Sequence, residues 1–360
     1  MATGRERTKT LNFMPFVIFR VVEFVCTAIL AWLLIFVVRF WAERRNVLDI
    51  PNDRSSHSEP VPRGGGLAIV AVCLAGWWCA PLFSTVQDWR GTACYGVGAA
   101  LIAAVSWLDD LQSLSRRVRF VVHSFAAILL ILGFGAWNTV SLPLVGDFSL
   151  AWVGCLVAFL WIVGLTNAYN FMDGIDGIAA SQAVIAGLGW IILGRASEPW
   201  TLGMLGLLVS AGSAGFLIHN WPPARIFMGD VGSAFLGYTF AFLALAAGSE
   251  NSRLCLAGIL LVWPFIFDSG LTFVRRLLER ENVFAAHRTH LYQRLVIAGW
   301  SHAAVTLLYV GLDLAGLLLA ILYANGATAA DWLILAGLPA MALGLWILVV
   351  WQERKHCPAT

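Results

Sequence analysis

The chain has 360 residues, of which 59% are hydrophobic and 12% are charged. Soluble domains carry about 25% charged residues, so this composition excludes a soluble globular protein. The formal net charge of +2 is too small to favour nucleic acid as a partner. The composition therefore predicts a polytopic protein surrounded by membrane lipids.

Apolar segments follow one another along the whole chain. About 20 apolar residues in a helix cross the hydrocarbon core of a bilayer. Eleven segments approach this length: 15–38, 66–84, 92–107, 120–137, 151–166, 178–194, 200–219, 232–249, 254–274, 302–323 and 331–351. No cleavage site precedes the first segment, which we expect to remain in place. Without a visible repeat or linker, we expect an all-α fold, in which residues 1–360 form one bundle of about eleven transmembrane helices.

The basic residues predict the orientation of this bundle. Of the 23 Lys and Arg residues, sixteen lie in the C-terminal tail and in the loops after the odd-numbered segments, and seven lie on the opposite side. Lys and Arg accumulate on the cytoplasmic side of membrane proteins, so the richer side is predicted to be cytoplasmic. The basic N-terminus, with Arg5, Arg7 and Lys9, favours the reverse orientation, which stays open.

The loops on the richer side carry the polar sequences of the chain. They read DIPNDRSSHSEPVPRGGG, DDLQSLSRRVR, NAYNFMDGIDG, HNWPPARIFMGDVGS and RRLLERENVFAAHRTHLYQRL. The loops on the other side are short and mostly featureless. This asymmetry predicts one site, assembled from five loops at one face of the membrane.

Five aspartates lie within a few residues of a predicted segment end. They are Asp109, Asp110, Asp173, Asp176 and Asp230. Carboxylates near hydrocarbon are costly unless they are paired or bind a metal. Oxygen ligands of this kind suit Mg²⁺, which usually also binds substrate phosphates. The loops also carry arginines whose planar guanidinium groups suit phosphate oxygens: Arg116, Arg117, Arg119, Arg288 and Arg294.

Each motif taken alone also fits a structural role. Asp109 and Asp110 could form a solvated helix end, and Asp230 could be the N-cap of a helix. Asn167, Asn170, Asp173 and Asp176 recur every three residues and would share one face of a helix, as a ligand site or as a polar helix contact. A zinc site at His287 and His290 is disfavoured because no third ligand is nearby. Asp268, inside a predicted span, fits pairing with a neighbouring helix as well as chemistry.

Together the loops indicate a phosphoryl-transfer enzyme of the membrane face. A transporter or flippase of a phosphorylated solute is the alternative, but its site should lie near the midplane of the bilayer, between related halves. A scaffold without catalysis would not need all five polar loops.

In their order from about Asp49 to Arg294, these loops resemble the polyprenyl-phosphate N-acetylhexosamine-1-phosphate transferase superfamily, glycosyltransferase family 4. The resemblance implies a bundle of ten or eleven helices in the bacterial cytoplasmic (inner) membrane, with its active site facing the cytoplasm. It implies transfer of a sugar 1-phosphate from a UDP-N-acetylhexosamine to undecaprenyl phosphate, with release of UMP. The implied cofactor is Mg²⁺, with Mn²⁺ as an alternative, and a homodimer is possible.

The resemblance also implies roles for individual residues. Asp230 and Asn170 match the metal ligands, and Asp109 and Asp110 match paired catalytic aspartates that act on the acceptor phosphate or support the metal. Asp173 and Asp176 match positions that shape the nucleotide site. The full set of expected substrate-binding residues is Asn167, Asp173, Asp176, Arg116, Arg117, His287, Arg288, His290 and Arg63.

Two departures from the family pattern affect these assignments. Many relatives have a lysine soon after the paired aspartates, where this chain reads DDLQSLSRR, so Arg116 or Arg117 is expected to supply the cation. The last loop reads HRTHLYQRL in place of three consecutive histidines, which disfavours a muramoyl-pentapeptide substrate. The pattern is closer to the branch that starts O-antigen or exopolysaccharide chains, and the sugar (GlcNAc, GalNAc, FucNAc or QuiNAc) stays open.

Overall fold

The computed structural model describes residues 3–51, 59–82, 88–196, 200–282 and 288–356. Helices dominate these ranges: α1 (Thr3–Arg45), α2 (Gly66–Cys79), α3 (Trp89–Gln112), α4 (Arg116–Phe134), α5 (Val153–Met172), α6 (Ile178–Leu193), α7 (Thr201–Asn220), α8 (Asp230–Glu250), α9 (Ser252–Leu260), α10 (Trp263–Leu278), α11 (Leu291–Ile297), α12 (His302–Ala324), α13 (Thr328–Trp332) and α14 (Leu338–His356). Short 3₁₀ turns, η1 (Ala80–Leu82) and η2 (Gly194–Ala196), and a π-helical turn, η3 (Leu333–Gly337), extend three of the helices.

Two small antiparallel hairpins complete the described chain. Strand β1 (Leu48–Asp49) pairs with β2 (Val61–Pro62), and β3 (Thr139–Leu142) pairs with β4 (Gly146–Ser149). The first hairpin follows α1, and the second joins α4 to α5.

The helices confirm the predicted all-α membrane bundle. Within the described ranges, eight helices are long and apolar enough to cross a bilayer, and α2 and α6 are shorter apolar helices. Each of the eleven predicted segments therefore coincides with apolar helix. The segment 254–274 is not one straight helix, because α9 and α10 meet at an angle of 73°. Pro264, in the first turn of α10, has no N–H to continue the hydrogen-bond ladder of α9 across the break.

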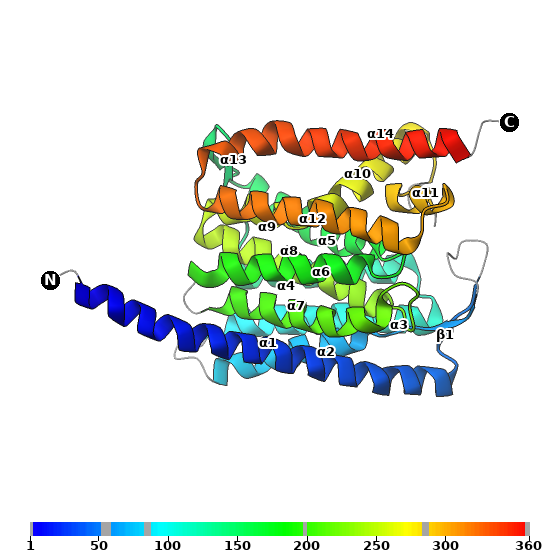
Figure 1. Ribbon diagram of the computed structural model, residues 1–360, viewed down its shortest axis with the longest axis horizontal. Coiled ribbons are helices and arrows are strands. Elements are labelled where there is room, and N and C mark those ends of the chain that lie inside the picture. The colour runs from blue at the N-terminus through cyan, green and yellow to red at the C-terminus, as the bar shows by residue number, and fades with distance from the viewer. Residues whose placement is uncertain (1–2, 52–58, 83–87, 197–199, 283–287, 357–360) are drawn as a thin grey trace.

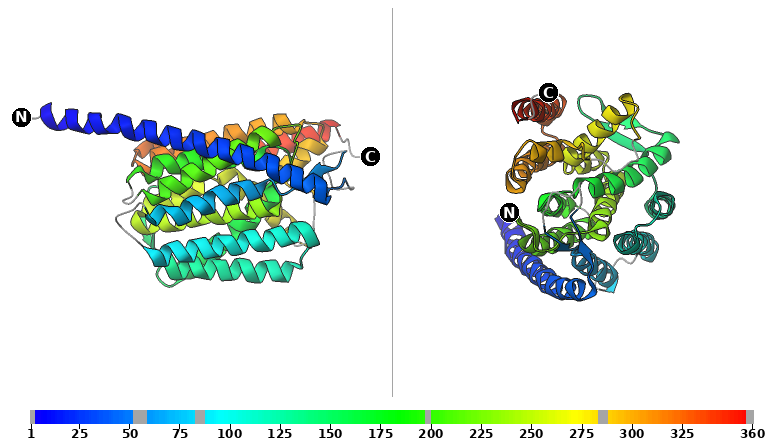
Figure 2. Two further views of the ribbon diagram at one scale, coloured as in Figure 1. Left: turned by 90° about the horizontal axis from the view of Figure 1, so that it is seen from below. Right: turned by 90° about the vertical axis from the view of Figure 1, so that its right-hand side faces the viewer.

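Helix α8 is the centre of the bundle. All its residues from Val231 to Gly248 are buried, and it packs against α2, α3, α5 and α9. Small residues permit this close packing: a Cβ added to Gly237 would lie 2.7 Å from the carbonyl oxygen of Leu165 on α5. By contrast, α1, α4 and α14 lie on the outside of the bundle and expose most of their apolar side chains, as helices facing lipid do. Figure 2 shows these outer helices from two further directions.

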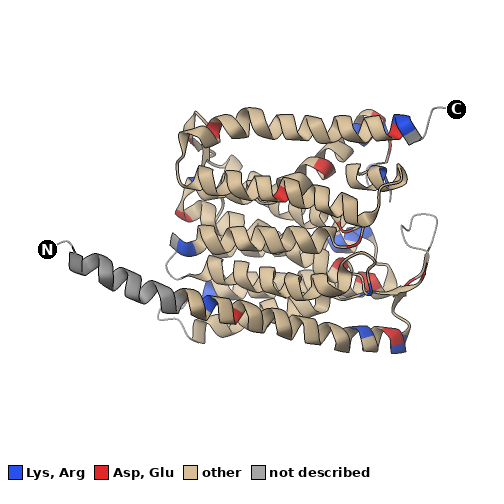
Figure 3. Cartoon of the chain, in the orientation of Figure 1, with Lys and Arg blue, Asp and Glu red and all other residues tan. Residues whose placement is uncertain are grey.

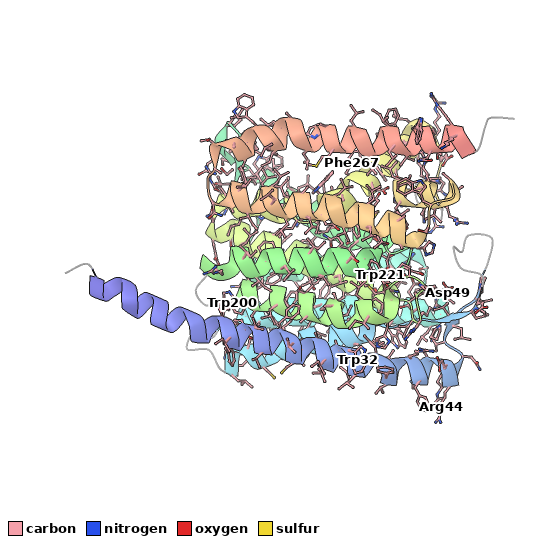
Figure 4. The ribbon with its side chains drawn as sticks, in the orientation of Figure 1. Trp32, Arg44, Asp49, Trp200, Trp221 and Phe267 are labelled. Carbon is pink, nitrogen blue, oxygen red and sulfur yellow. The ribbon has the colours of Figure 1, made fainter. Side chains whose placement is uncertain are left out.

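The polar loops gather at one end of the bundle. The C-terminal ends of α1, α3, α5, α7, α10 and α14 lie at the right in Figure 1, whereas β3–β4, α13 and the start of α1 lie at the left. Many of the charged residues lie at the same right-hand end in Figure 3, and in Figure 4 Asp49 and Trp221 mark this end and Trp200 the opposite one. The predicted alternation of loops is thus observed. Which end faces the cytoplasm remains a prediction.

Candidate active site

The C-terminal end of α3 is joined to the start of α8 by the carboxylate of Asp110. Its Oδ1 accepts a hydrogen bond from the backbone N–H of Asp230, and its Oδ2 accepts one from Val231, both at 3.1 Å. The first N–H groups of a helix have no partner within the helix, and a negative charge there is favourable. Gly229 makes this approach possible, since a Cβ there would lie 2.7 Å from Asp110 Oδ2. Asp110, which is only 4% exposed, therefore fixes the position of Asp230.

Asp109 is held by its own loop and by α4. Its Oδ1 accepts the N–H of Leu114 at 2.5 Å, and its Oδ2 accepts Nη1 of Arg119, also at 2.5 Å. The same Nη1 lies 3.4 Å from Oδ2 of Asp230. Arg119 is therefore the guanidinium that bridges the two carboxylates.

The two arginines expected to supply the cation lie elsewhere. Arg116 and Arg117 are exposed at the beginning of α4. In the described part of the chain, Arg119 rather than either of them forms the ion pairs with Asp109 and Asp230. A role for Arg116 or Arg117 in substrate binding remains a prediction.

Asp230 also meets α5. Its carboxylate lies beside the side chains of Asn170 and Asp109. Asn170, in the last turn of α5, donates from Nδ2 to Oγ of Ser233 at 3.1 Å, and Ser233 donates to the carbonyl oxygen of Gly229 at 3.2 Å. The three helices α3, α5 and α8 thus bring Asp109, Asn170 and Asp230 together.

A further carboxylate, Asp173, lies just after the end of α5 and is half-buried. Burial, and then the negative charges of Asp230, Asp110 and Asp176, raise the pKa of Asp173 well above its usual range. Gathering carboxylates in this way is unfavourable without a compensating cation. No three His, Cys, Asp or Glu side chains of the described residues form a metal cage by themselves. Mg²⁺ needs only one or two carboxylates, because waters and substrate phosphates complete its shell, so the oxygens of Asp230 and Asn170 fit it.

The comparisons with known proteins show the family of this chain. The sequence profile of glycosyl transferase family 4 matches residues 92–248. A probable undecaprenyl-phosphate N-acetylglucosaminyl 1-phosphate transferase of Bacillus subtilis is 35% identical over 286 residues, which cover 78% of each chain. The chain belongs to glycosyl transferase family 4.

Other relatives carry related names. The decaprenyl-phosphate N-acetylglucosaminephosphotransferase of Mycobacterium tuberculosis is 30% identical over 325 residues, 81% of this chain and 80% of the relative. A phospho-N-acetylmuramoyl-pentapeptide-transferase of Latilactobacillus sakei is 30% identical over 243 residues, 64% of this chain and 75% of the relative. The profile match runs from α3 to α8 and so includes Asp109, Asn170 and Asp230.

Within the family 4 match, the residues spaced by three do not share one helix. Asn167 and Asn170 belong to α5, which ends at Met172, whereas Asp173 and Asp176 lie in the turn before α6. The expectation of one helical face is therefore wrong. The turn ends at Gly177, whose φ of +80° suits glycine and directs the chain into α6.

Asn167 and Asp176 are engaged within the protein. Nδ2 of Asn167 donates to the carbonyl oxygen of Val163 at 2.7 Å and lies 3.4 Å from Nδ1 of His123. Asp176 accepts the N–H of Ala224 at 3.0 Å and lies 3.3 Å from Nδ1 of His302. These two residues tie α5 to α4 and the α5–α6 turn to α12, and their roles in substrate binding remain predictions.

Two further expected residues lie outside the family 4 match. Nη2 of Arg63 donates to the carbonyl oxygen of Asp110, so that β2 is fastened to the end of α3. His290 immediately precedes α11, and its Nδ1 lies 3.2 Å from Oδ1 of Asp268. Arg288 lies near Tyr292, and His287 lies outside the described residues.

The structure gives definite contacts to residues that sequence reasoning did not distinguish from their neighbours. Arg119 is a cation ten positions after Asp109, but nothing in the sequence distinguished it from Arg116 and Arg117 as the partner of that carboxylate. His302, at the start of an apolar span, has no local signal at all. Arg294 was considered for phosphate, but its Nε and Nη2 donate to Glu353 on α14 at 2.6 and 2.5 Å.

Proposed function

We propose that this family 4 protein transfers N-acetylhexosamine 1-phosphate from a UDP-sugar to undecaprenyl phosphate and releases UMP. The observation that carries the proposal is the convergence of Asp109, Asn170 and Asp230 from three helices at one end of the bundle. The names of the Bacillus and Mycobacterium relatives support the same chemistry. Such a reaction would initiate an O-antigen, an exopolysaccharide or another polysaccharide of the cell envelope.

The acidic cluster fits a divalent cation between protein and diphosphate. We propose that Asp230 and Asn170 hold Mg²⁺, or Mn²⁺, which would neutralise negative charge on the transferring phosphoryl group. Arg119 already lies against both Asp109 and Asp230, so its guanidinium is available to a phosphate oxygen beside them. Asp110 holds the end of α8 and so keeps Asp230 in place.

In the proposed reaction an oxygen of the lipid phosphate attacks the β-phosphorus of the UDP-sugar. A new P–O bond forms to the lipid, the bond to the bridging oxygen breaks, and UMP leaves with that oxygen. A phosphate monoester, with its second pKa of about 6, is mostly ionised at neutral pH and needs no obligatory base. Phosphoryl transfer depends mainly on positioning and on charge stabilisation, which the cluster can supply. We therefore propose Asp109 as a positioning partner of Arg119 and of the acceptor, rather than as an essential base.

A groove on the outside of the bundle fits the lipid substrate. It has a volume of about 610 Å³ and lies between the α9–α10 break and α14. Its lining is wholly apolar: Ile259, Trp263, Ile266, Phe267, Leu271, Leu338, Pro339, Ala342, Leu343 and Trp346. Phe267 lies beneath α14 in Figure 4. We propose that the isoprenoid chain occupies this groove, with its phosphate toward the polar end of the bundle.

This arrangement favours an enzyme over a transporter. A transporter of a phosphorylated solute would place its polar site near the midplane, in interrupted helices of two related halves. Here the carboxylates lie at helix ends, in the last turn of α3, just after the end of α5 and in the first turn of α8. An active site at one membrane face can meet a soluble nucleotide and a lipid together, and we propose that this face is the cytoplasmic face of the inner membrane.

The proposal is tested with purified protein in detergent, undecaprenyl phosphate, Mg²⁺ and a panel of UDP-N-acetylhexosamines, by following UMP release. We expect UMP only when lipid, metal and one of the sugars are all present, and the productive sugar identifies the donor. The Asp230→Asn variant should insert and fold but release no UMP. Release of UMP without the lipid, or no release with any sugar, would contradict the proposed transfer.

A further inference from the structure

Helix α12 carries a buried aspartate for which the described chain offers no hydrogen-bond donor. Asp313 is 1% exposed, and none of the described residues hydrogen-bonds to either oxygen of its carboxylate. By contrast, the buried carboxylate of Asp268 on α10 accepts the N–H groups of Leu291 and Tyr292 and the hydroxyl of Tyr309. Buried polar groups nearly always have a partner, so an exception of this kind indicates a group that the protein chain itself does not supply.

The break between α9 and α10 leaves a carbonyl oxygen without its helical partner. In an uninterrupted helix the oxygen of Leu260 would accept the N–H of the residue four positions later, but that residue is Pro264, which has no N–H. This oxygen is directed at α12, since a Cβ added to Gly316 would lie 2.5 Å from it. Gly316 follows Asp313 by three residues, so the two share the buried face of α12, about one turn apart.

Helix α6 adds a third oxygen at the same break. Gln182 is fully buried and donates from Nε2 to the carbonyl oxygen of Leu261 at 2.8 Å. The amide nitrogen therefore faces the break. The amide oxygen, Oε1, lies on the other side of the amide group and has no partner among the residues that the structure describes.

The register of α6 against α12 brings this amide to the level of Asp313. Both helices start at the polar end of the bundle and run in the same direction (Figure 1). Just before α6, Gly177 lies against Thr306, and near the other end of α6, Gly189 lies against Leu317. Interpolation between these two contacts places the amide within about one helical turn, roughly 5 Å, of the level of Asp313.

The three oxygens form a set of acceptors without a donor. Asp313 and Gln182 both face the α9–α10 break, where the carbonyl oxygen of Leu260 is directed at α12 and that of Leu261 at α6. One negative charge with neutral carbonyl oxygens matches a monovalent cation, because the occupied site is then neutral. A divalent cation would leave an excess positive charge among apolar helices, which is costly. Interrupted helices of membrane transporters bind Na⁺ through carbonyl groups that are freed in the same way.

We propose that the carboxylate of Asp313, Oε1 of Gln182 and the carbonyl oxygen of Leu260 bind a monovalent cation, Na⁺, at the break between α9 and α10. The cation stabilises the angle of 73° between these two helices. Trp263 joins this site to the apolar groove: it lines the groove and donates from Nε1 to the carbonyl oxygen of Leu312 at 3.0 Å. Occupation of the site therefore also favours lipid binding. This consequence, unlike the site itself, rests on the proposed function, which places the lipid in the groove.

Binding is measured with ²²Na⁺ on the purified full-length protein in detergent, by a scintillation proximity assay at constant ionic strength in choline chloride. We expect saturable binding that unlabelled NaCl displaces, that Asp313→Asn abolishes and that Gln182→Leu weakens several-fold. The thermal midpoint should rise with NaCl in the wild type and not in Asp313→Asn, because a ligand of the folded state stabilises it. Asp331→Asn is the control: it removes the same charge from α13, away from the break, and should bind ²²Na⁺ as the wild type does.

Two results would overturn the cation site. Without saturable ²²Na⁺ binding to the folded wild-type protein, Asp313 is a neutral, protonated acid. With equal binding by the wild type and Asp313→Asn, the cation lies elsewhere. If Asp313→Asn does not fold, wild-type affinity in Gln182→Leu has the same meaning.

The effect on the groove is measured separately, by UMP release with undecaprenyl phosphate varied. KM for the lipid should rise when choline chloride replaces NaCl, with KM for the UDP-sugar unchanged, and Asp313→Asn should show the higher lipid KM in both salts. An equal lipid KM in the two salts would overturn the coupling to the groove. If the protein transfers no sugar phosphate, the proposed function fails, whereas ²²Na⁺ binding still decides the cation site.

Discussion

The clearest prediction concerns Asp110, whose two carboxylate oxygens accept the N–H groups of Asp230 and Val231 at 3.1 Å each. In the Asp110→Asn variant one oxygen becomes an NH₂ group, which is a donor and cannot accept either N–H. One buried N–H then loses its partner, and the favourable charge at the N-terminus of α8 disappears.

The magnitude follows from these contacts. A hydrogen bond to a charged group contributes about 1.5–3 kcal/mol, and a charge at a partly buried helix terminus contributes up to about 2 kcal/mol. We expect Asp110→Asn to lower the free energy of unfolding by roughly 2–4 kcal/mol. Because Asp230 is the first residue of α8, a shift of about 1 Å in the helix end should also reduce kcat by about 100-fold.

Thermal unfolding in detergent and UMP release measure the two effects on one preparation. Asp230→Asn is the comparison variant, because the Asp230 side chain contacts Arg119 and accepts neither of the two N–H groups that Asp110 holds. It should lose activity with a smaller fall in the thermal midpoint than Asp110→Asn. A wild-type midpoint in Asp110→Asn together with lost activity would refute the reasoning, because Asp110 would then act on substrate directly.

Three further predictions concern Arg119, the metal and an isolated acid. Arg119→Met should reduce kcat by about 100-fold or more, as for loss of a donor to developing charge. Arg117→Met should cost less, because Arg119 and not Arg117 forms the ion pairs with Asp109 and Asp230 in the described chain. Equal losses would show that Arg119 has no special role. Chelation of the metal by EDTA should abolish UMP release, and added Mg²⁺ or Mn²⁺ should restore it. Binding of Mn²⁺, measured by electron paramagnetic resonance, should be lost in the Asp230→Asn variant. If this variant still binds Mn²⁺, Asp230 is not the metal ligand. In sodium-free buffer, Asp313→Leu should raise the free energy of unfolding by about 1–3 kcal/mol, because it removes a buried polar group without a partner in the described chain. A lower thermal midpoint in this variant would show that the Asp313 carboxylate has a hydrogen-bond partner.

The helices of this fold could be predicted well from the sequence because a lipid bilayer surrounds them. In lipid every backbone polar group must be satisfied within its own helix, so the length and hydropathy of a segment define a span directly. The same rule predicted that the loops after alternate spans share one end, where Asp109, Asn170 and Asp230 lie. What the pattern did not show was the break between α9 and α10, although Pro264 was a local signal for it.

Hydropathy and spacing therefore determined from the sequence alone that the chain is a helical membrane bundle with its acidic loops at one end. Only the tertiary structure decided which groups meet there: Arg119 rather than Arg116 or Arg117 between the carboxylates, Asp110 as the cap of α8, and Tyr309 on Asp268. The members of these contacts are 10 to 120 positions apart. A periodic pattern reports the environment of a segment, whereas such pairings depend on how the helices pack around α8.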